Sequence, residues 1–132
     1  MQGRFPTDQG FDEWYGIPDT TDQTVWPTQP GFDPTLVHAA HIYEGQKGSP
    51  SRQVKPYDLT TRPEIDMEIT DRAIDFMERS AAAKKPFYAY VPYTLVHYPT
   101  LPSAEFKGST GHGDWADPCP DGSQCGTPAR HR

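Results

Sequence analysis

Residues 86–93 read Pro-Phe-Tyr-Ala-Tyr-Val-Pro-Tyr, a short run that is almost entirely apolar and aromatic. Such a run is typical of a strand buried on both faces, as in a parallel sheet that is flanked by helices. We therefore predict a buried strand over residues 86–93. Parallel strands need neighbours, and no other run in the chain is equally convincing, so this strand indicates a piece of a larger sheet.

The residues before this run carry the clearest helical period, and they predict one helix over residues 63–83. Pro63 suits a first helical turn, with Thr61 as a possible cap, and Pro86 stops the helix. Charged residues spaced i to i+4 with the acid first occupy the other face: Glu68 with Arg72, and Asp75 with Arg79. Apolar residues recur at three- and four-residue steps: Ile65, Ile69, Ala73 and Phe76 or Met77. A helix followed by a buried strand is half of an α/β repeat, so the predicted fold class is α/β.

Residues 1–62 predict a long N-terminal loop region, because prolines and glycines interrupt every potential element. The region also contains many aromatic residues, which a solvated linker rarely does, so we expect an ordered loop that packs them. The stretch 36–42 is compatible with either a helical turn or a strand.

Composition excludes several function classes. The chain has 132 residues, a net charge of −6 and 15 prolines. The negative charge disfavours nucleic-acid binding, and no apolar run reaches the length of a membrane span. An apolar fraction of 34% and many loops predict marginal folding of the chain alone.

The residues after the predicted strand read Thr-Leu-Val-His-Tyr-Pro, from Thr94 to Pro99. Ligands of open α/β sheets bind beyond the carboxyl ends of the strands, which is where His97 falls. His97 is therefore the candidate catalytic residue, the alternative being an ordinary loop histidine.

Four stretches in order resemble the sulfatase family, whose nucleophile is a formylglycine made from cysteine or serine. They are residues 6–16, the helix and strand ending at residues 85–90, the His-x-Pro of residues 97–99, and the glycine-rich residues 106–117. The resemblance implies a partial sulfatase domain over residues 1–117, an internal fragment of an alkaline-phosphatase-like sandwich. In that family the histidine at the position of His97 contacts the sulfate group and helps the alcohol leave.

Other family features are absent from this sequence. It lacks the paired aspartates that hold calcium, the Cys/Ser-x-Pro-x-Arg motif, the Gly-Lys-Trp-His segment, and the later Asp-Asn ligands and second lysine. The stretch 48–52 imitates the modification motif, but Gly48 occupies the nucleophile position and has no side chain to convert. Calcium and formylglycine are therefore expected only in a full-length parent, and this chain alone is expected to be inactive.

Several other residues are weaker candidates. His38 and His41 would face one way on a helix, but two histidines usually mark a solvated surface. We interpret the acidic residues of the opening stretch as turn and packing residues: Asp8, Asp12 and Glu13. The family match assigns no catalytic role to Lys107 or His112. Four large aromatic residues favour core packing over stacking on a substrate: Trp14, Tyr15, Trp26 and Trp115.

The resemblance stops at Pro118. Codons for residues 118–132 read one nucleotide out of frame can give a family-like helix, so we expect a disordered or frameshifted tail, with Cys119 and Cys125 as its accidents. The nucleotide sequence tests this hypothesis.

The leading hypothesis is a fragment of a sulfatase whose parent hydrolyses the sulfate ester of a small molecule or glycan. One alternative is a non-catalytic remnant or binding module that uses its aromatic loops. Another is a related phosphoesterase of the same superfamily. The compartment stays open, with a periplasmic, secreted or lysosomal parent all compatible with the sequence.

Overall fold

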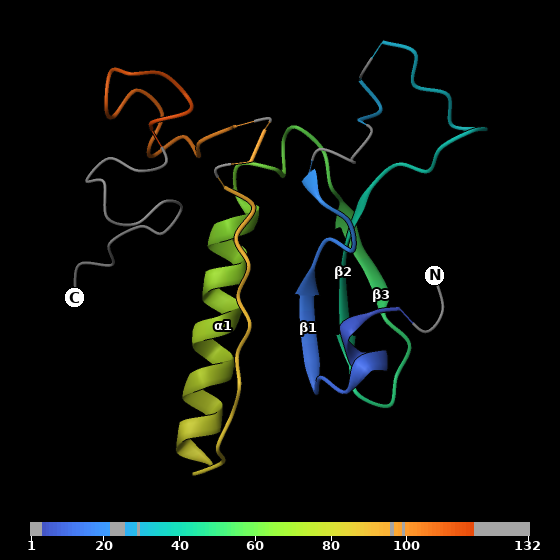
Figure 1. Ribbon diagram of the computed structural model, residues 1–132, viewed down its shortest axis with the longest axis vertical. Coiled ribbons are helices and arrows are strands. Elements are labelled where there is room, and N and C mark those ends of the chain that lie inside the picture. Colours follow the sequence, from blue (N-terminus) through green and yellow to red (C-terminus); the bar gives the residue numbers. More distant parts are fainter. Residues whose placement is uncertain (1–3, 22–25, 29, 96, 99, 118–132) are drawn as a thin grey trace. The chain divides into compact units, whose positions relative to one another are not determined.

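A computed structural model describes residues 4–21, 26–28, 30–95, 97–98 and 100–117 (Figure 1). The chain divides into two compact units, Met1–Arg62 and Pro63–Arg132. The first contains a short 3-10 helix and a three-stranded sheet, and the second contains one long helix. The residues of the predicted tail, 118–132, including both cysteines, lie outside the described part of the chain.

The first unit is built around a small antiparallel sheet. Its strands, β1 (Glu13–Gly16), β2 (His41–Gln46) and β3 (Arg52–Pro56), follow one another in the order β1-β2-β3. The prediction of a long loop region over residues 1–62, in which only residues 36–42 were compatible with a strand or a helical turn, is therefore wrong. The strands are only four to six residues long and two of them end in Gly16 and Pro56, which mask the strand pattern. Both of these are edge strands, where such residues are tolerated.

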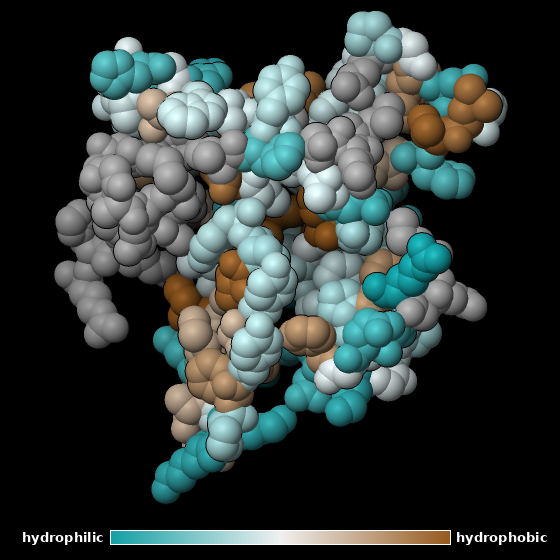
Figure 2. All heavy atoms as spheres, viewed as in Figure 1, coloured by the Kyte–Doolittle hydropathy of each residue, from teal (hydrophilic) through white to brown (hydrophobic). Residues whose placement is uncertain are grey.

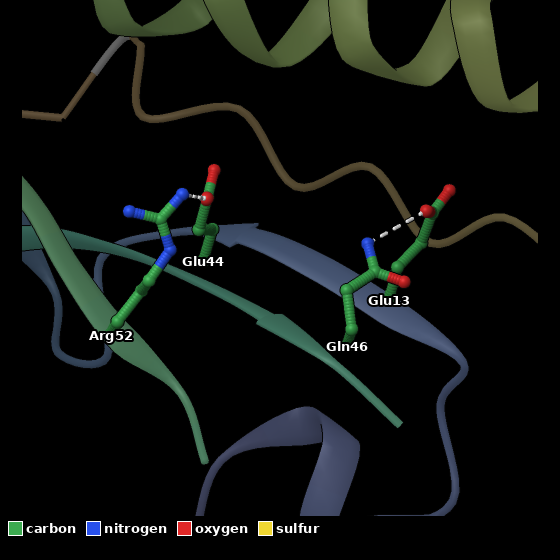
Figure 3. Close-up of polar contacts among 4 residues, drawn as sticks. All are labelled: Glu13, Glu44, Gln46 and Arg52. Atoms are coloured by element: carbon green, nitrogen blue, oxygen red, sulfur yellow. Dashed lines mark hydrogen bonds and ion pairs between the residues drawn. The ribbon is translucent and has the colours of Figure 1, made fainter. Parts of the chain in front are cut away.

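One face of the sheet is polar, and its side chains pair across the strands. Glu13 lies opposite Gln46, whose amide donates to the Glu13 carboxylate at 3.1 Å. Glu44 lies opposite Arg52 and forms an ion pair with it. Figure 3 shows both pairs projecting from the same side of the sheet. Cross-strand pairs of this kind fix the register of a small sheet.

Trp14 is held in place by a glycine on the neighbouring strand. Trp14 lies opposite Gly45, and its indole N–H donates to the Ser51 hydroxyl at 2.9 Å. A Cβ on Gly45 would lie 2.5 Å from both the indole nitrogen and that hydroxyl. The ring also stacks on Phe5 and Tyr43, with centroids 5.2 and 6.4 Å away. Gly45 is therefore required by close packing rather than by an unusual backbone angle.

Ile42 and Tyr57 are fully buried residues of the first unit, and Trp26 is 4% exposed. The rings of Trp26 and Tyr57 pack with centroids 5.2 Å apart, and the Tyr57 hydroxyl lies 3.3 Å from the hydroxyl of Thr21. The aromatic residues of this loop-rich region thus form a core, as the sequence predicts.

The second unit begins with the predicted helix, α1 (Ile65–Ala82). The helix confirms the periodic pattern, although it starts two residues later than predicted, with Glu64 at the cap position instead of Thr61. Thr61 instead closes a turn, accepting from the Asp58 N–H at 2.9 Å. The expected pair of Asp75 and Arg79 is present at 2.7 Å.

The C-terminal end of α1 is closed by a left-handed residue. Lys84 has φ = 53°, and the N–H groups of Lys84 and Lys85 donate to the carbonyls of Ala81 and Ser80 at 3.0 Å. These bonds satisfy carbonyls that the last helical turn leaves without partners. Pro86 follows, and the chain reverses direction.

Residues 86–93 are not a strand, and the predicted burial is also wrong. The chain here returns along α1 without a neighbouring strand to pair with (Figure 1). Phe87 packs edge-on against Phe76 of the helix at 5.6 Å between centroids, but Tyr88 and Tyr90 are 73% and 68% exposed. In Figure 2, apolar side chains reach the surface around the C-terminal end of α1. We call residues 85–94 the return segment.

The α/β class is confirmed at the level of a helix and a sheet in one chain. The sheet is antiparallel and lies in the N-terminal unit. Within the described residues, no helix has both the length and the apolar character needed to cross a membrane.

Candidate active site

The loop that carries His97 is attached to the first turn of α1 by one carboxylate. Asp66 is only 2% exposed, and its Oδ1 accepts from both the backbone N–H and the hydroxyl of Thr94 at 2.8 Å. Its Oδ2 accepts from the Leu95 N–H at 3.0 Å. Two consecutive backbone donors are therefore bound by the two oxygens of one buried side chain, which fixes both the position and the direction of the chain there.

A second contact holds the residue just before this loop. The Thr70 hydroxyl, one turn further along α1, donates to the Asp66 carbonyl at 2.7 Å and lies 3.1 Å from the Tyr93 hydroxyl. The end of the return segment is thus bound to α1 at successive turns.

His97 follows on a bend and is exposed. Its backbone N–H donates to the Thr94 carbonyl at 3.1 Å, which closes a four-residue turn on the residue that Asp66 binds. Its Nδ1 lies 3.0 Å from the Tyr98 carbonyl. A carbonyl can only accept, so this contact places a proton on Nδ1 and leaves Nε2 as the ring nitrogen that can face a substrate.

The glycine-rich residues that follow form a second anchored loop. Asp117 is 1% exposed and accepts from the Gly108 N–H at 2.6 Å, and from the hydroxyl and N–H of Thr110 at 2.7 and 3.2 Å. The Thr110 hydroxyl and the Gly108 N–H hold the pKa of Asp117 below its usual value. Lys107 and His112 are both exposed on this loop.

The two histidines of the first unit do not share a helix. His41 begins β2, with its Nδ1 2.8 Å from the Ala39 carbonyl, and His38 lies on an irregular, exposed stretch. Across the described part of the chain, no three His, Cys, Asp or Glu side chains are grouped closely enough to hold a metal ion.

The acidic residues of the opening stretch have structural contacts. Asp8 accepts from the Phe5 N–H at 3.0 Å, Asp12 pairs with Lys47 at 3.3 Å, and Glu13 belongs to the sheet pair described above. Gly48, rejected as a modification site, lies in the β2–β3 turn with φ = 83°. These residues shape the first unit.

The large aromatic residues differ in their surroundings. Trp26 is buried and Trp14 is stacked within its unit, as expected for packing residues. Tyr15 is half-buried in β1. Trp115 is 68% exposed, so packing among the described residues does not account for it.

Sequence reasoning missed Asp66, Thr70 and Thr94. Asp66 lies within the predicted helix, where an acid in the first turn looks like a simple complement to the helix dipole. Its true partners are 28 residues away, a separation that no local pattern indicates.

Comparisons with known proteins give a consistent result. The chain is similar to the N-acetylgalactosamine-6-sulfatases of dog (Canis lupus familiaris), at 26% identity over 117 residues, and of mouse (Mus musculus) and pig (Sus scrofa), at 28% over 117 and 118 residues. Each match covers 85% of this chain. No family model matches the chain, and no solved structure gives a significant match.

The similarity extends through both units, because it covers far more of the chain than either unit alone. The chain spans only about a fifth of the length of these relatives, 20–21%. Its sequence motifs, their order and the similarity to three sulfatases agree, and the chain resembles the sulfatase family over most of its length.

Proposed function

We propose that this chain is the part of a sulfatase domain that supplies the active-site histidine, His97, for hydrolysis of a sulfate ester. Residues 1–117 form that part, and the complete domain is an α/β sandwich of the alkaline-phosphatase type. The observation that carries the proposal is the anchored loop. An exposed imidazole follows a segment fixed to α1 through the buried Asp66 carboxylate.

The chemistry of an imidazole suits this role. Cleavage of a sulfate ester leaves an alcohol oxygen that gains negative charge, and a donor placed beside that oxygen stabilises it. With Nδ1 bonded to the Tyr98 carbonyl, the proton that His97 exchanges with a substrate is the one on Nε2. The substrate is a sulfated small molecule or glycan, as the names of the relatives suggest for those proteins.

The calcium and formylglycine of the family do not fit the residues of this chain. The described residues offer no metal-binding group, and Gly48 occupies the nucleophile position of the one motif-like stretch. We therefore assign both groups to the remainder of a full-length sulfatase and derive no step from them here. The 132-residue chain by itself is expected to hydrolyse no sulfate ester.

The test uses a full-length sulfatase that carries this segment, assayed with 4-methylumbelliferyl sulfate and, in parallel, with the matching phosphate. Replacement His97→Ala should lower kcat by about 10²- to 10⁴-fold, the usual contribution of a general acid or base. Calcium content, measured by elemental analysis, should be unchanged. His112→Ala is the matched control, an exposed loop histidine of the same unit, and should retain full activity.

Unchanged turnover in His97→Ala would remove His97 from the mechanism and favour a non-catalytic role for this segment. Turnover of the phosphate in preference to the sulfate would instead favour a phosphoesterase. Both results contradict the proposal in different ways.

A further inference from the structure

The unit that carries His97 contains a buried carboxylate, Asp66, whose hydrogen bonds all go to the two residues that begin the His97 turn, Thr94 and Leu95. Asp66 accepts three hydrogen bonds, all from Thr94 and Leu95. Asp75 on the same helix is exposed and pairs only with Arg79, four residues away. A buried carboxylate costs free energy unless its partners satisfy it, so the loop and the helix must adopt this arrangement together.

The contacts continue from Asp66 to the imidazole without interruption. Asp66 binds the N–H of Thr94, the carbonyl of Thr94 accepts from the N–H of His97, and Nδ1 of His97 meets the Tyr98 carbonyl. The backbone of the turn is therefore fixed at its first residue by a side chain of α1. Displacement of Thr94 would displace the turn and change the direction of the His97 ring.

We propose that Asp66 is a positioning residue for His97, acting through Thr94 and Leu95 and never touching substrate. The inference rests on the proposed function of His97. It adds a separate requirement, that the rate of the reaction depends on the helix that precedes the loop. Loss of the Asp66 anchor should therefore change turnover rather than substrate binding, because misplacement of a catalytic group by about 1 Å can cost about 10²-fold.

The first experiment uses the ¹⁵N-labelled chain and amide hydrogen exchange. Asp66→Asn replaces one accepting oxygen by an NH₂ group, which cannot accept from Leu95 or Thr94. Exchange of the Leu95 amide should become roughly 10- to 100-fold faster, the effect of a lost charged acceptor. Helix content by circular dichroism should be preserved. Asp75→Asn, the matched control on the same helix, should leave Leu95 unchanged, and equal exchange in wild type and Asp66→Asn would overturn the anchor.

The second experiment is a double-mutant cycle in the full-length sulfatase. Asp66→Asn should lower kcat by about 10²-fold with KM unchanged, and should have no further effect in the His97→Ala background. Full additivity of the two substitutions, or a change in KM alone, would overturn the positioning role. If His97→Ala alone does not change kcat, the proposed function fails. The single variant shows this result independently of the coupling between the two residues.

A milder variant guards against loss of folding. Thr94→Val removes only the hydroxyl donor and keeps both backbone bonds to Asp66. It should lower kcat in the same direction by a smaller factor, again only when His97 is present. A wild-type kcat in Thr94→Val combined with an unfolded Asp66→Asn would count against the proposal.

Discussion

The sheet of the first unit and the return segment of the second are both extended and rich in aromatic residues, yet they are held differently. In the sheet, β2 pairs with both neighbours, and the rings of Trp14 and Tyr43 pack against Phe5. The return segment has no paired strand beside it and is held by side chains, chiefly Asp66 and Thr70. The difference shows that aromatic content alone does not make a strand, because a strand needs a partner strand. Where the partner is missing, individual side chains must fix the path of the backbone.

This comparison predicts that the sheet depends on packing. Ile42 is fully buried in the central strand, so Ile42→Ala should lower the free energy of unfolding of the first unit by about 2–5 kcal/mol. Urea unfolding followed by tryptophan fluorescence in a Trp115→Phe background measures this, since Trp14 and Trp26 then report on this unit alone. Val54→Ala on exposed β3 should cost under about 1 kcal/mol. A similar loss in both variants would contradict the packing argument.

The close approach of β1 and β2 at Gly45 predicts a somewhat smaller loss of stability than the loss expected for Ile42→Ala. Gly45→Ala should cost about 1–3 kcal/mol, because the new Cβ meets the Trp14 indole and the Ser51 hydroxyl. The same urea experiment applies. In a Trp14→Ala background the penalty should shrink, since the most crowded neighbour is gone. A penalty that is equal in both backgrounds would assign the effect to the backbone instead.

In the turn that begins the return segment, one substitution should increase stability. Lys84 holds φ = 53°, a conformation that costs a residue with a Cβ about 1 kcal/mol relative to glycine. Lys84→Gly should therefore stabilise α1 by up to about 1 kcal/mol, less what the lost positive charge contributes at the helix end. Thermal unfolding at 222 nm measures the change. Ala83→Gly, at a right-handed position, should be destabilising, and a gain there would argue against the φ-angle explanation.

The smallest expected effect is a loss of local stability around Asp117 at low pH. Asp117 has a lowered pKa in the folded chain, so its ionisation stabilises residues 108–117 above the unfolded pKa of about 3.9, and this contribution is lost as pH falls through the folded value. The Gly108 amide signal should therefore shift below about pH 4, with Asp117→Asn abolishing the transition. Amides within β2 should not follow the same titration. If the β2 amides titrated together with the Gly108 amide, the transition would not be local to Asp117, and this prediction would be contradicted.

Sequence reasoning succeeded where the determinants are local. The apolar period and the i to i+4 pair of Asp75 and Arg79 predicted α1 to within two residues at its start. Three strands were missed because each is short and its pairing partner is distant in sequence, as with Glu13 and Gln46. The run at residues 86–93 has strand composition but no partner strand among the residues that the structure describes.

The candidate site shows the same division. His97 was found from its place after an apolar run and from the family resemblance, and its role stays a prediction. Asp66 was not found, because a carboxylate in a first helical turn looks the same whether it faces solvent or a loop 28 residues later. Only the three-dimensional contact distinguishes the two.

The pairing of α1 with the return segment also constrains length. The 18 residues of α1 cover about 27 Å at about 1.5 Å each, and the chain from Lys85 to Thr94 covers about 30 Å when nearly fully extended. The extended segment is therefore only slightly longer than the helix that it follows. The difference of about 3 Å is close to the roughly 3.3 Å that one residue spans, so a single deletion would use all of this slack, and a second would take Thr94 out of hydrogen-bond reach of Asp66. Deletions between Lys85 and Thr94 should therefore be far less tolerated than in the turn between β2 and β3.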